Sequence, residues 1–278
     1  MSTVSAPTRP TPSTLRVGWS RVGLELKMFF RERDAVVFSF LLPIVLLAIF
    51  AVVFGDQEIT VDGAAVSLAG YMAPAMVASG IFLVSFQSLA ISIALERDER
   101  MLKRLRGTPM PPVAYFLGKI GMVIVTATAQ TGLLLASAAL AFGLELPTEP
   151  GKWLTFAWVF LLGAAAGTVL GIAYSSVPRS GRSAAAVVTG PMLIMMFISG
   201  VFFVFRDLPE WLQAVASGFP LKWLAQGMRS ALLPEEFAAV EVSESWQHGP
   251  TVLILAAWLV AGLVVATWTF QWTRRNDR

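Results

Sequence analysis

The stretch AVVFSFLLPIVLLAIFAVVF, residues Ala35–Phe54, contains no Asp, Glu, Lys, Arg or His. An α-helix needs about 20 apolar residues to cross the hydrocarbon core of a bilayer. One charge at the centre of such a helix costs roughly 2.5–3.5 kcal/mol on insertion scales. The stretch therefore predicts a membrane-spanning helix. No short apolar core with a small-residue cleavage site precedes it, so we expect an uncleaved anchor.

Five further runs of similar length and equal lack of charge follow along the chain. The composition agrees, because 56% of residues are hydrophobic and 14% are charged, against about 25% charged in an average soluble domain. Buried helices of a large soluble protein would show polar faces, and these runs show none. We predict an all-α integral membrane protein with six spans. The predicted spans are Ala35–Phe54, Tyr71–Leu95, Ile120–Phe142, Trp153–Ser175, Ala184–Phe205 and Thr251–Phe270.

Lys and Arg are distributed unevenly between the segments that connect the spans. Segments on one side carry 17 of them and segments on the other side carry four. Basic segments stay in the cytoplasm, so both termini are expected there. A tail rich in Pro, Ser and Thr, residues 1–14, is expected to be disordered. The basic segments are 1–34, 96–119, 176–183 and 271–278.

The segment Leu15–Asp34 carries a helical apolar stripe. Its members recur at steps of four and three, which places them on one face of a helix, and most of the basic residues fall off that face. An amphipathic helix in the cytoplasmic interface is the favoured interpretation, and a cytosolic helix packed on the protein body is the alternative. The stripe consists of Leu15, Trp19, Val22, Leu26 and Phe29.

The connecting segment 96–112 predicts a short charged helix that continues the second span. Glu99 and Lys103 lie four residues apart with the acid first, the favourable helical order, and Gly107 with Pro109 ends the helix. Its small apolar face favours a docking surface for a cytosolic partner over a basic loop that only fixes orientation. The predicted docking residues are Glu96, Arg97, Glu99, Arg100, Met101, Leu102, Lys103 and Leu105.

The segment 206–250 is long for a loop in a compact membrane protein. Its apolar residues, among them Trp211 and Trp223, are expected to dip into the outer leaflet edge or to pack on span ends. The cations Lys222 and Arg229 are expected to be anchors at the outer surface.

Small and polar residues inside the spans indicate packing faces. Gly163, Gly167 and Gly171 form two overlapping steps of four, which let another helix approach closely, within or between subunits. Polar groups inside spans hydrogen-bond a neighbouring helix or line a route. The residues assigned to a substrate route or to helix packing are Gln87, Gln130, Ser199, Phe202 and Phe203.

The sequence lacks the residues that several kinds of functional site require. The chain has no G-x-x-x-x-G-K-[ST] phosphate-binding loop, and the predicted spans hold no carboxylate or histidine of the kind that ion-coupled transporters need. Cysteine is absent, and His248, the single histidine, is expected in a solvated loop. We therefore expect no catalytic, cofactor or metal site, and an external motor for transport. A passive channel, an ion-coupled secondary transporter and a membrane-embedded assembly or sensor protein remain alternatives.

Two regions resemble the ABC-2 type permease family. The sequence LERDERMLKRLRGTPM, Leu95–Met110, resembles the charged cytoplasmic signature of that family. Gly190–Phe203, Leu208–Leu212 and Phe219–Arg229 resemble its fifth span and outer helices. The resemblance runs from about Leu15 to the end and implies a single transmembrane domain, residues 15–278. The most similar subgroup is the bacterial drug-resistance permeases of the daunorubicin-exporter type.

The resemblance also implies partners. A permease of this family pairs with a second permease subunit, here expected as a homodimer, and each copy docks one ATPase subunit that binds ATP and Mg. The chain itself would bind no cofactor and no nucleic acid. The expected function is export of an amphipathic drug-like or lipid-like substrate, such as drug efflux, across the bacterial plasma membrane. By resemblance, Glu96–Arg106 is the coupling helix, Leu15–Asp34 the connecting helix, and 206–250 the re-entrant outer helices.

Overall fold

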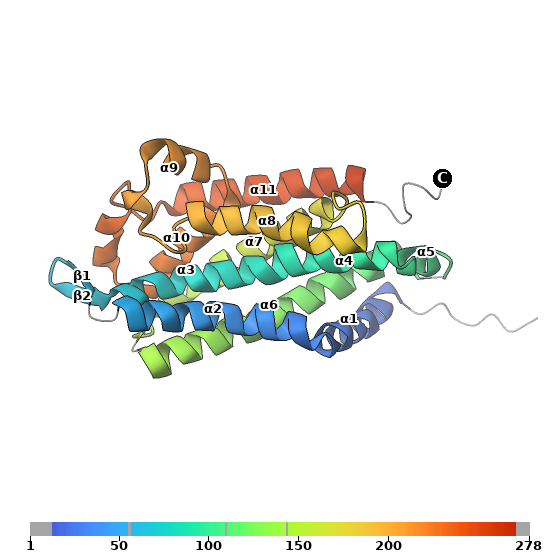
Figure 1. Cartoon of the computed structure of the whole chain (residues 1–278), viewed down its shortest axis with the longest axis horizontal. Coiled ribbons are helices and arrows are strands. Elements are labelled where there is room, and N and C mark those ends of the chain that lie inside the picture. Colours follow the sequence, from blue (N-terminus) through green and yellow to red (C-terminus); the bar gives the residue numbers. More distant parts are fainter. Residues whose placement is uncertain (1–12, 55–56, 109, 143, 271–278) are drawn as a thin grey trace, which may run out of the picture.

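The computed structural model describes residues 13–54, 57–108, 110–142 and 144–270. Six long apolar segments, each able by length and composition to cross a membrane, run along the long axis of the molecule (Figure 1). The all-α membrane fold with six spans is therefore confirmed. The spans are α2 (Arg33–Phe54), α3 (Leu68–Phe82) continued by the π-helix η1 (Leu83–Ser88) and α4 (Leu89–Asp98), α6 (Pro112–Phe142), α7 (Pro150–Tyr174), α8 (Gly181–Ile198) and α11 (His248–Thr269).

Several spans extend further than their apolar runs. The third begins at Pro112, eight residues before the predicted start, so it contains Lys119, and the second runs on past Leu95 to include Glu96. These two helices continue through Lys119 and Glu96 because the charges are paired inside the protein and do not end the helices. The fifth span is shorter than predicted and ends at Ile198, shortly before Gly200, whose φ of 71° lies in the left-handed region.

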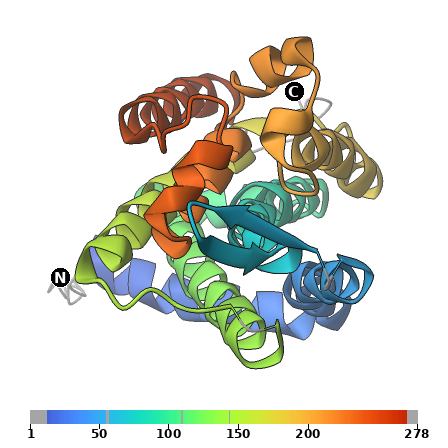
Figure 2. The same ribbon diagram turned by 90° about the vertical axis from the view of Figure 1, so that its left-hand side faces the viewer.

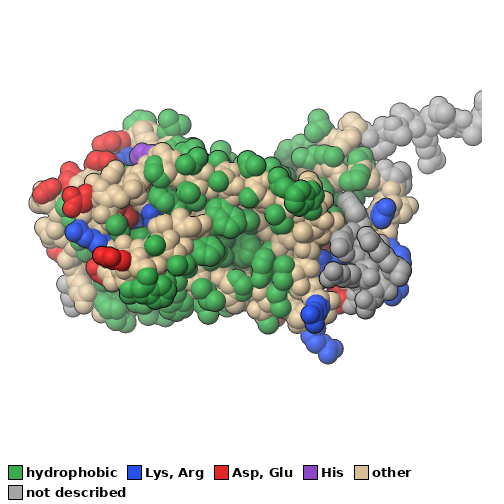
Figure 3. Space-filling model, turned by 90° about the horizontal axis from the view of Figure 1, so that it is seen from above, with side chains coloured by type: hydrophobic (Ala, Val, Ile, Leu, Met, Phe, Trp, Pro, Cys, Tyr) green, Lys and Arg blue, Asp and Glu red, His purple; other side chains and the backbone are tan. Residues whose placement is uncertain are grey.

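The two ends of the bundle differ in charge (Figure 3). The basic end carries α1 (Thr14–Arg31), α5 (Met101–Arg106) and the loop between α7 and α8. The hairpin end carries the strands β1 (Glu58–Val61) and β2 (Ala64–Ser67) and the segments between α8 and α11. On the face that Figure 3 shows, hydrophobic side chains gather between the two ends, as expected of a protein that faces lipid. The segments between α8 and α11 are η2 (Phe205–Asp207), α9 (Glu210–Ala216), α10 (Pro220–Leu232) and η3 (Glu235–Val240).

The first connecting segment forms a β-hairpin that the sequence analysis did not predict. The strands pair antiparallel from Glu58 opposite Ser67 to Val61 opposite Ala64. Asp62 and Gly63 make the turn with φ of 47° and 88°, and Asp-Gly is favoured in a two-residue turn because both positions need positive φ. Figure 2 looks onto this end, with the hairpin near its centre.

The core lies around α3 and α10. Every residue from Ala69 to Phe82 is buried, and so is every residue of α10. Helix α10 packs against α3, α7 and α11, so this part of the segment 206–250 packs on the spans, one of the two outcomes expected for its apolar residues. Trp223 and Leu224 are buried there, whereas the Trp211 side chain is 67% exposed.

The glycine face of α7 packs inside the subunit. A Cβ on Gly163 would lie 2.3 Å from the Leu224 side chain of α10, and a Cβ on Gly167 would lie 2.1 Å from Ser85 Oγ in η1. A Cβ on Gly171 would meet the Ser85 and Phe86 carbonyl oxygens at 2.8 and 2.9 Å. These glycines therefore allow α10 and the π-helix to approach α7 closely.

Candidate functional site

The predicted docking segment is two helices and not one. Helix α4 ends at Asp98, Arg100 adopts a left-handed φ of 60°, and α5 begins at Met101. Leu102 and Glu96 are buried, with Leu102 0% exposed, so these two predicted docking residues face the body of this chain. The apolar face therefore anchors α5 from inside, and Leu105 also packs against the core.

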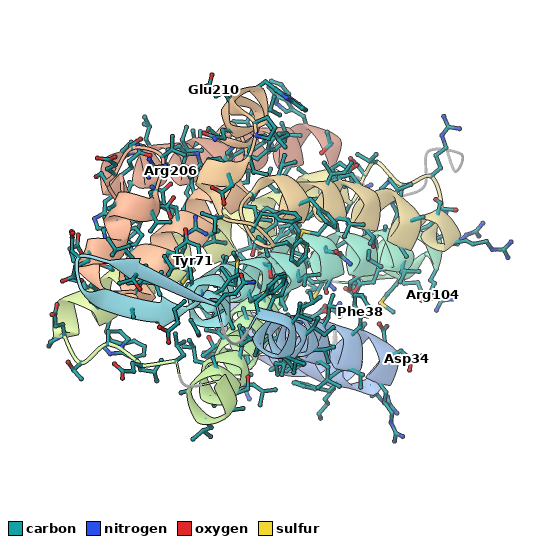
Figure 4. The ribbon with its side chains drawn as sticks, turned by 60° about the vertical axis from the view of Figure 1, so that its left-hand side comes forward. Asp34, Phe38, Tyr71, Arg104, Arg206 and Glu210 are labelled. Carbon is teal, nitrogen blue, oxygen red and sulfur yellow. The ribbon has the colours of Figure 1, made fainter. Side chains whose placement is uncertain are left out.

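The remaining predicted docking residues form a charged rim around α5. Glu99, Arg100 and Lys103 are exposed, while Arg97 and Met101 are half-buried. Arg97 Nη2 donates a hydrogen bond to the Pro178 carbonyl at 3.0 Å, which ties α4 to the loop between α7 and α8. The rim continues beyond the predicted set with Arg104, which extends from the basic end (Figure 4), and Arg106.

A buried charge cluster joins three segments of the basic end. It consists of Arg21 and Glu25 on α1, Glu96 on α4, and Tyr115 and Lys119 on α6. Lys119 Nζ donates to Glu25 Oε2 at 2.7 Å, to Ser92 Oγ at 3.1 Å and to Glu96 Oε1. Tyr115 donates its hydroxyl proton to Glu96 Oε2 at 2.9 Å, and Arg21 Nη2 lies 2.5 Å from Glu25 Oε1.

The cluster balances two cations against two carboxylates. Lys119 is 0% exposed and Glu25 2% exposed, and buried charges persist only when they are paired and hydrogen-bonded. Gly118 and Gly121 bring α1 close enough, since a Cβ at these positions would lie 2.3 Å from the Arg21 side chain and 2.4 Å from the Val22 side chain. The glycine pair around Lys119 is the sequence signal that the analysis missed.

Helix α1 packs on the body of the protein along α6, and its placement in the cytoplasmic membrane interface stays a prediction. Its buried residues are Gly18, Arg21, Val22 and Glu25. The predicted stripe is divided: Val22 is buried, whereas Leu15 and Trp19 are 73% and 76% exposed. The face of α1 that packs on the protein therefore differs from the apolar stripe, because the charge cluster brings Arg21 and Glu25 inward.

A cavity of about 300 Å³, which we name the inner cavity, lies between α1, α2, α4 with η1, and α8 near the basic end. Gln87 lines it and donates from Nε2 to Thr189 Oγ1 of α8 at 3.3 Å. Gln87 therefore bonds a neighbouring helix, as one of the two alternatives held, and its place in a substrate route stays a prediction. Gln130 does not reach the inner cavity, and its amide sits where a Cβ on Gly80 would be.

The predicted residues Phe202 and Phe203 line a second cavity of about 560 Å³ near the hairpin end, the outer groove. Five phenylalanines from α2, α8 and the turn after it contribute, and the rings of Phe50 and Phe202 stack with centroids 6.4 Å apart. Ser199 does not line this groove. It is 0% exposed, and its hydroxyl has no hydrogen-bond partner among the described residues.

The expectation that Lys222 and Arg229 are surface anchors is wrong. Arg229 is 0% exposed, bonds Glu241 Oε1 through Nε at 2.6 Å and donates from Nη1 to the Gly200 carbonyl at 3.2 Å. Lys222 is 4% exposed and bonds Gln226. Burial of Lys222 lowers its pKa to about 8, although the Glu241 carboxylate acts in the opposite direction. Arg229 therefore ties α10 to the segments around Gly200 and Glu241, whereas the hydrogen bond of Lys222 stays within α10.

His248 begins α11 and does not lie in a loop, although its side chain is exposed as expected. Its Nε2 lies 3.0 Å from Ser230 Oγ of α10. Within the described part of the chain, no group of three or more His, Cys, Asp or Glu residues is placed to hold a metal ion.

The comparison with protein families agrees with this architecture. A family model described as ABC-2 family transporter protein matches residues 54–270, which include five of the six spans, α5 and the whole segment between α8 and α11. No curated protein matches the chain. The match covers well over half of the sequence, and the chain belongs to the ABC-2 family of transporter proteins.

Proposed function

We propose that this chain is the permease subunit of an ATP-driven exporter, energised by a separate ATPase subunit that docks at the basic end. The observation that carries the proposal is the connection between the exposed rim of α5 and the spans. Leu102 anchors α5 in the core, and a few residues away Glu96 joins Lys119 and, through it, Glu25. A force applied to α5 would therefore act on α1, α4 and α6 together, because packed and ion-paired elements move as a unit.

The proposal places the basic end and both termini in the cytoplasm, because the excess of Lys and Arg lies there. The membrane would be a bacterial plasma membrane, and a second copy of the chain would complete the route as a homodimer. The ATPase partner would hold ATP and Mg. The cargo is amphipathic, drug-like or lipid-like, since both cavities offer mostly apolar walls with few polar groups. The daunorubicin-exporter type of drug efflux remains the subgroup we propose.

The first experiment is purification of the tagged chain from its native membrane in a gentle detergent, with all co-purifying subunits sequenced. We expect a soluble subunit with a phosphate-binding loop. The double variant R104E/R106E reverses charge on the exposed rim and should lose that subunit while the chain still inserts. The control R182E changes an exposed arginine at the start of α8, at the same end but outside α5. Full recovery of the ATPase subunit with R104E/R106E would contradict the docking assignment.

The ion-coupled transporter stays as a second candidate because the charge cluster places Glu96 and Lys119 in segments counted as spans. Titratable groups inside membrane helices are the usual feature of proton-coupled transport. Export from vesicles with a fixed ATP supply separates the two candidates. Collapse of export when an uncoupler removes the proton gradient would favour ion coupling, whereas loss of export only on ATP depletion favours the ATPase.

A further inference from the structure

The inner cavity differs in charge from the end of the molecule where it lies. The basic end is rich in Lys and Arg, yet the charged side chains that line the inner cavity within the described residues are two carboxylates, Glu25 and Glu32. Glu25 is neutralised by Arg21 and Lys119. Glu32, at the end of α1, is exposed and makes no ion pair with the described part of the chain. The cavity therefore keeps one unbalanced negative charge.

Uncharged polar side chains from the spans also line the inner cavity. Gln87 is 7% exposed, and its Nε2 is occupied by Thr189. Its carbonyl oxygen receives no hydrogen bond from any described residue, and the Gln87 residue lines the cavity. The hydroxyls of Ser39 and Ser88 lie 3.4 Å apart on the same wall. A carboxylate, an amide oxygen and hydroxyl lone pairs together suit a ligand that donates hydrogen bonds and carries positive charge.

The other walls are apolar and adaptable. Met28, Phe29, Phe38 and Met122 line the cavity from α1, α2 and α6, and Phe38 and Asp34 mark the start of α2 in Figure 4. Methionine side chains fit irregular ligands, and aromatic faces attract cations. A volume of about 300 Å³ lies at the small end of drug-sized sites, so one short apolar chain or ring fits.

We propose that the inner cavity binds amphiphiles with a primary ammonium head, and that Glu32 determines the preference for positive charge. The role of these amphiphiles as export cargo rests on the proposed function, but their binding to this chain does not. The ammonium lies at the mouth beside Glu32, and the apolar part fills the space between the methionines and phenylalanines. An anionic amphiphile of the same size is rejected by the Glu32 carboxylate.

The test measures equilibrium binding of radiolabelled decylammonium and of uncharged decanol to the full chain in phosphatidylcholine nanodiscs, with empty nanodiscs subtracted. Because Glu32 is exposed, E32Q should weaken decylammonium binding about fivefold at low salt and leave decanol unchanged. Raised salt should shrink this difference by screening. The control E99Q removes an equal charge from an exposed position of the basic end outside the cavity, and should change binding less than twofold.

A second variant locates the site. Ala185 lines the cavity from α8 and is exposed, so A185W should fill the space and abolish binding of both probes. The proposal is overturned if E32Q and E99Q weaken decylammonium equally, if decanol loses affinity in parallel with it, or if A185W binds like the unchanged chain. The assay needs no ATPase, so such a result leaves the exporter proposal intact. Conversely, charge-selective binding in a chain that recruits no ATPase would reject the exporter and keep the site.

Discussion

Replacement of Lys119 by methionine tests the buried charge cluster directly. Methionine keeps most of the length and apolar volume of the lysine stem but removes the ammonium that bonds Glu25 and Glu96. Both carboxylates stay buried, with Arg21 as the one remaining cation of the cluster. Breaking a buried pair by removing one partner costs about 3–5 kcal/mol, which is a factor of roughly 10² to 10³ or more in the folding equilibrium.

The assay is reversible unfolding of the chain in mixed micelles of dodecylmaltoside and SDS, followed by tryptophan fluorescence. The double variant K119M/E96Q removes one charge of each sign and should recover part of the loss, so a double-mutant cycle gives the coupling energy of the pair. The control K27M removes a cation from an exposed position of α1 and should change stability by less than about 0.5 kcal/mol. If K119M were as stable as K27M, our account of the cluster as the connection between α1, α4 and α6 would be wrong.

Three further predictions concern the other packed contacts. G171A should destabilise the fold by about 1–3 kcal/mol, because its Cβ would meet two carbonyl oxygens of η1. The control G132A has open space around its Cβ and should be neutral or slightly stabilising in the same unfolding assay. R229M should lower the free energy of unfolding by about 3–5 kcal/mol, because it leaves Glu241 buried without its partner. The double variant R229M/E241Q should regain much of this loss. Equal stability of the single and double variants would contradict the pairing. The pKa of Lys222 is about 8 in the folded protein, whereas its ordinary value is 10.5. Between these two pH values the unfolded chain binds more protons than the folded one. The free energy of unfolding should therefore rise with pH, on the order of 1 kcal/mol from pH 8 to pH 9.5. K222M should lack this rise, and an identical pH profile for both proteins would refute the assignment.

The apolar runs were enough to predict the number and order of the spans, because a helix in lipid must be long and uncharged on its lipid side. The limits of the spans were not predictable in the same way. The sequence-based prediction ends each span at the first charged residue. Lys119 and Glu96 nevertheless lie within their helices, because each has a partner more than twenty residues away in the sequence. Pairing over such distances leaves no periodic pattern in a single sequence.

The hairpin end illustrates the same limit and one avoidable omission. Lys222 and Arg229 were placed at the surface by their charge, but Arg229 pairs with Glu241 across the turn after α10 and is buried. The β-hairpin, by contrast, is predictable from the sequence, because Asp62-Gly63 is a typical two-residue hairpin turn. Among the candidate site residues, Gln87 can be identified from the sequence because it is a polar residue within a span. Glu25 and Glu32 cannot be identified in this way, because they lie in a segment that contains many other charged residues.

The π-helix η1 gives the second span a particular dependence on residue count. Each residue of a helix advances the direction of the following side chains by about 100°, and a π turn accommodates more residues per turn than the helix on either side of it. The angular position of Glu96 on α4 is therefore determined ten residues earlier, where Leu83–Ser88 lies against Gly167 and Gly171. Loss of one residue from η1 would let the π turn return to α-helix and leave the direction of Glu96 nearly unchanged, whereas loss of one residue from α4 before Glu96 would turn Glu96 by about 100° away from Lys119. For this span, a one-residue deletion within α4 is therefore a more severe change than the same deletion within η1.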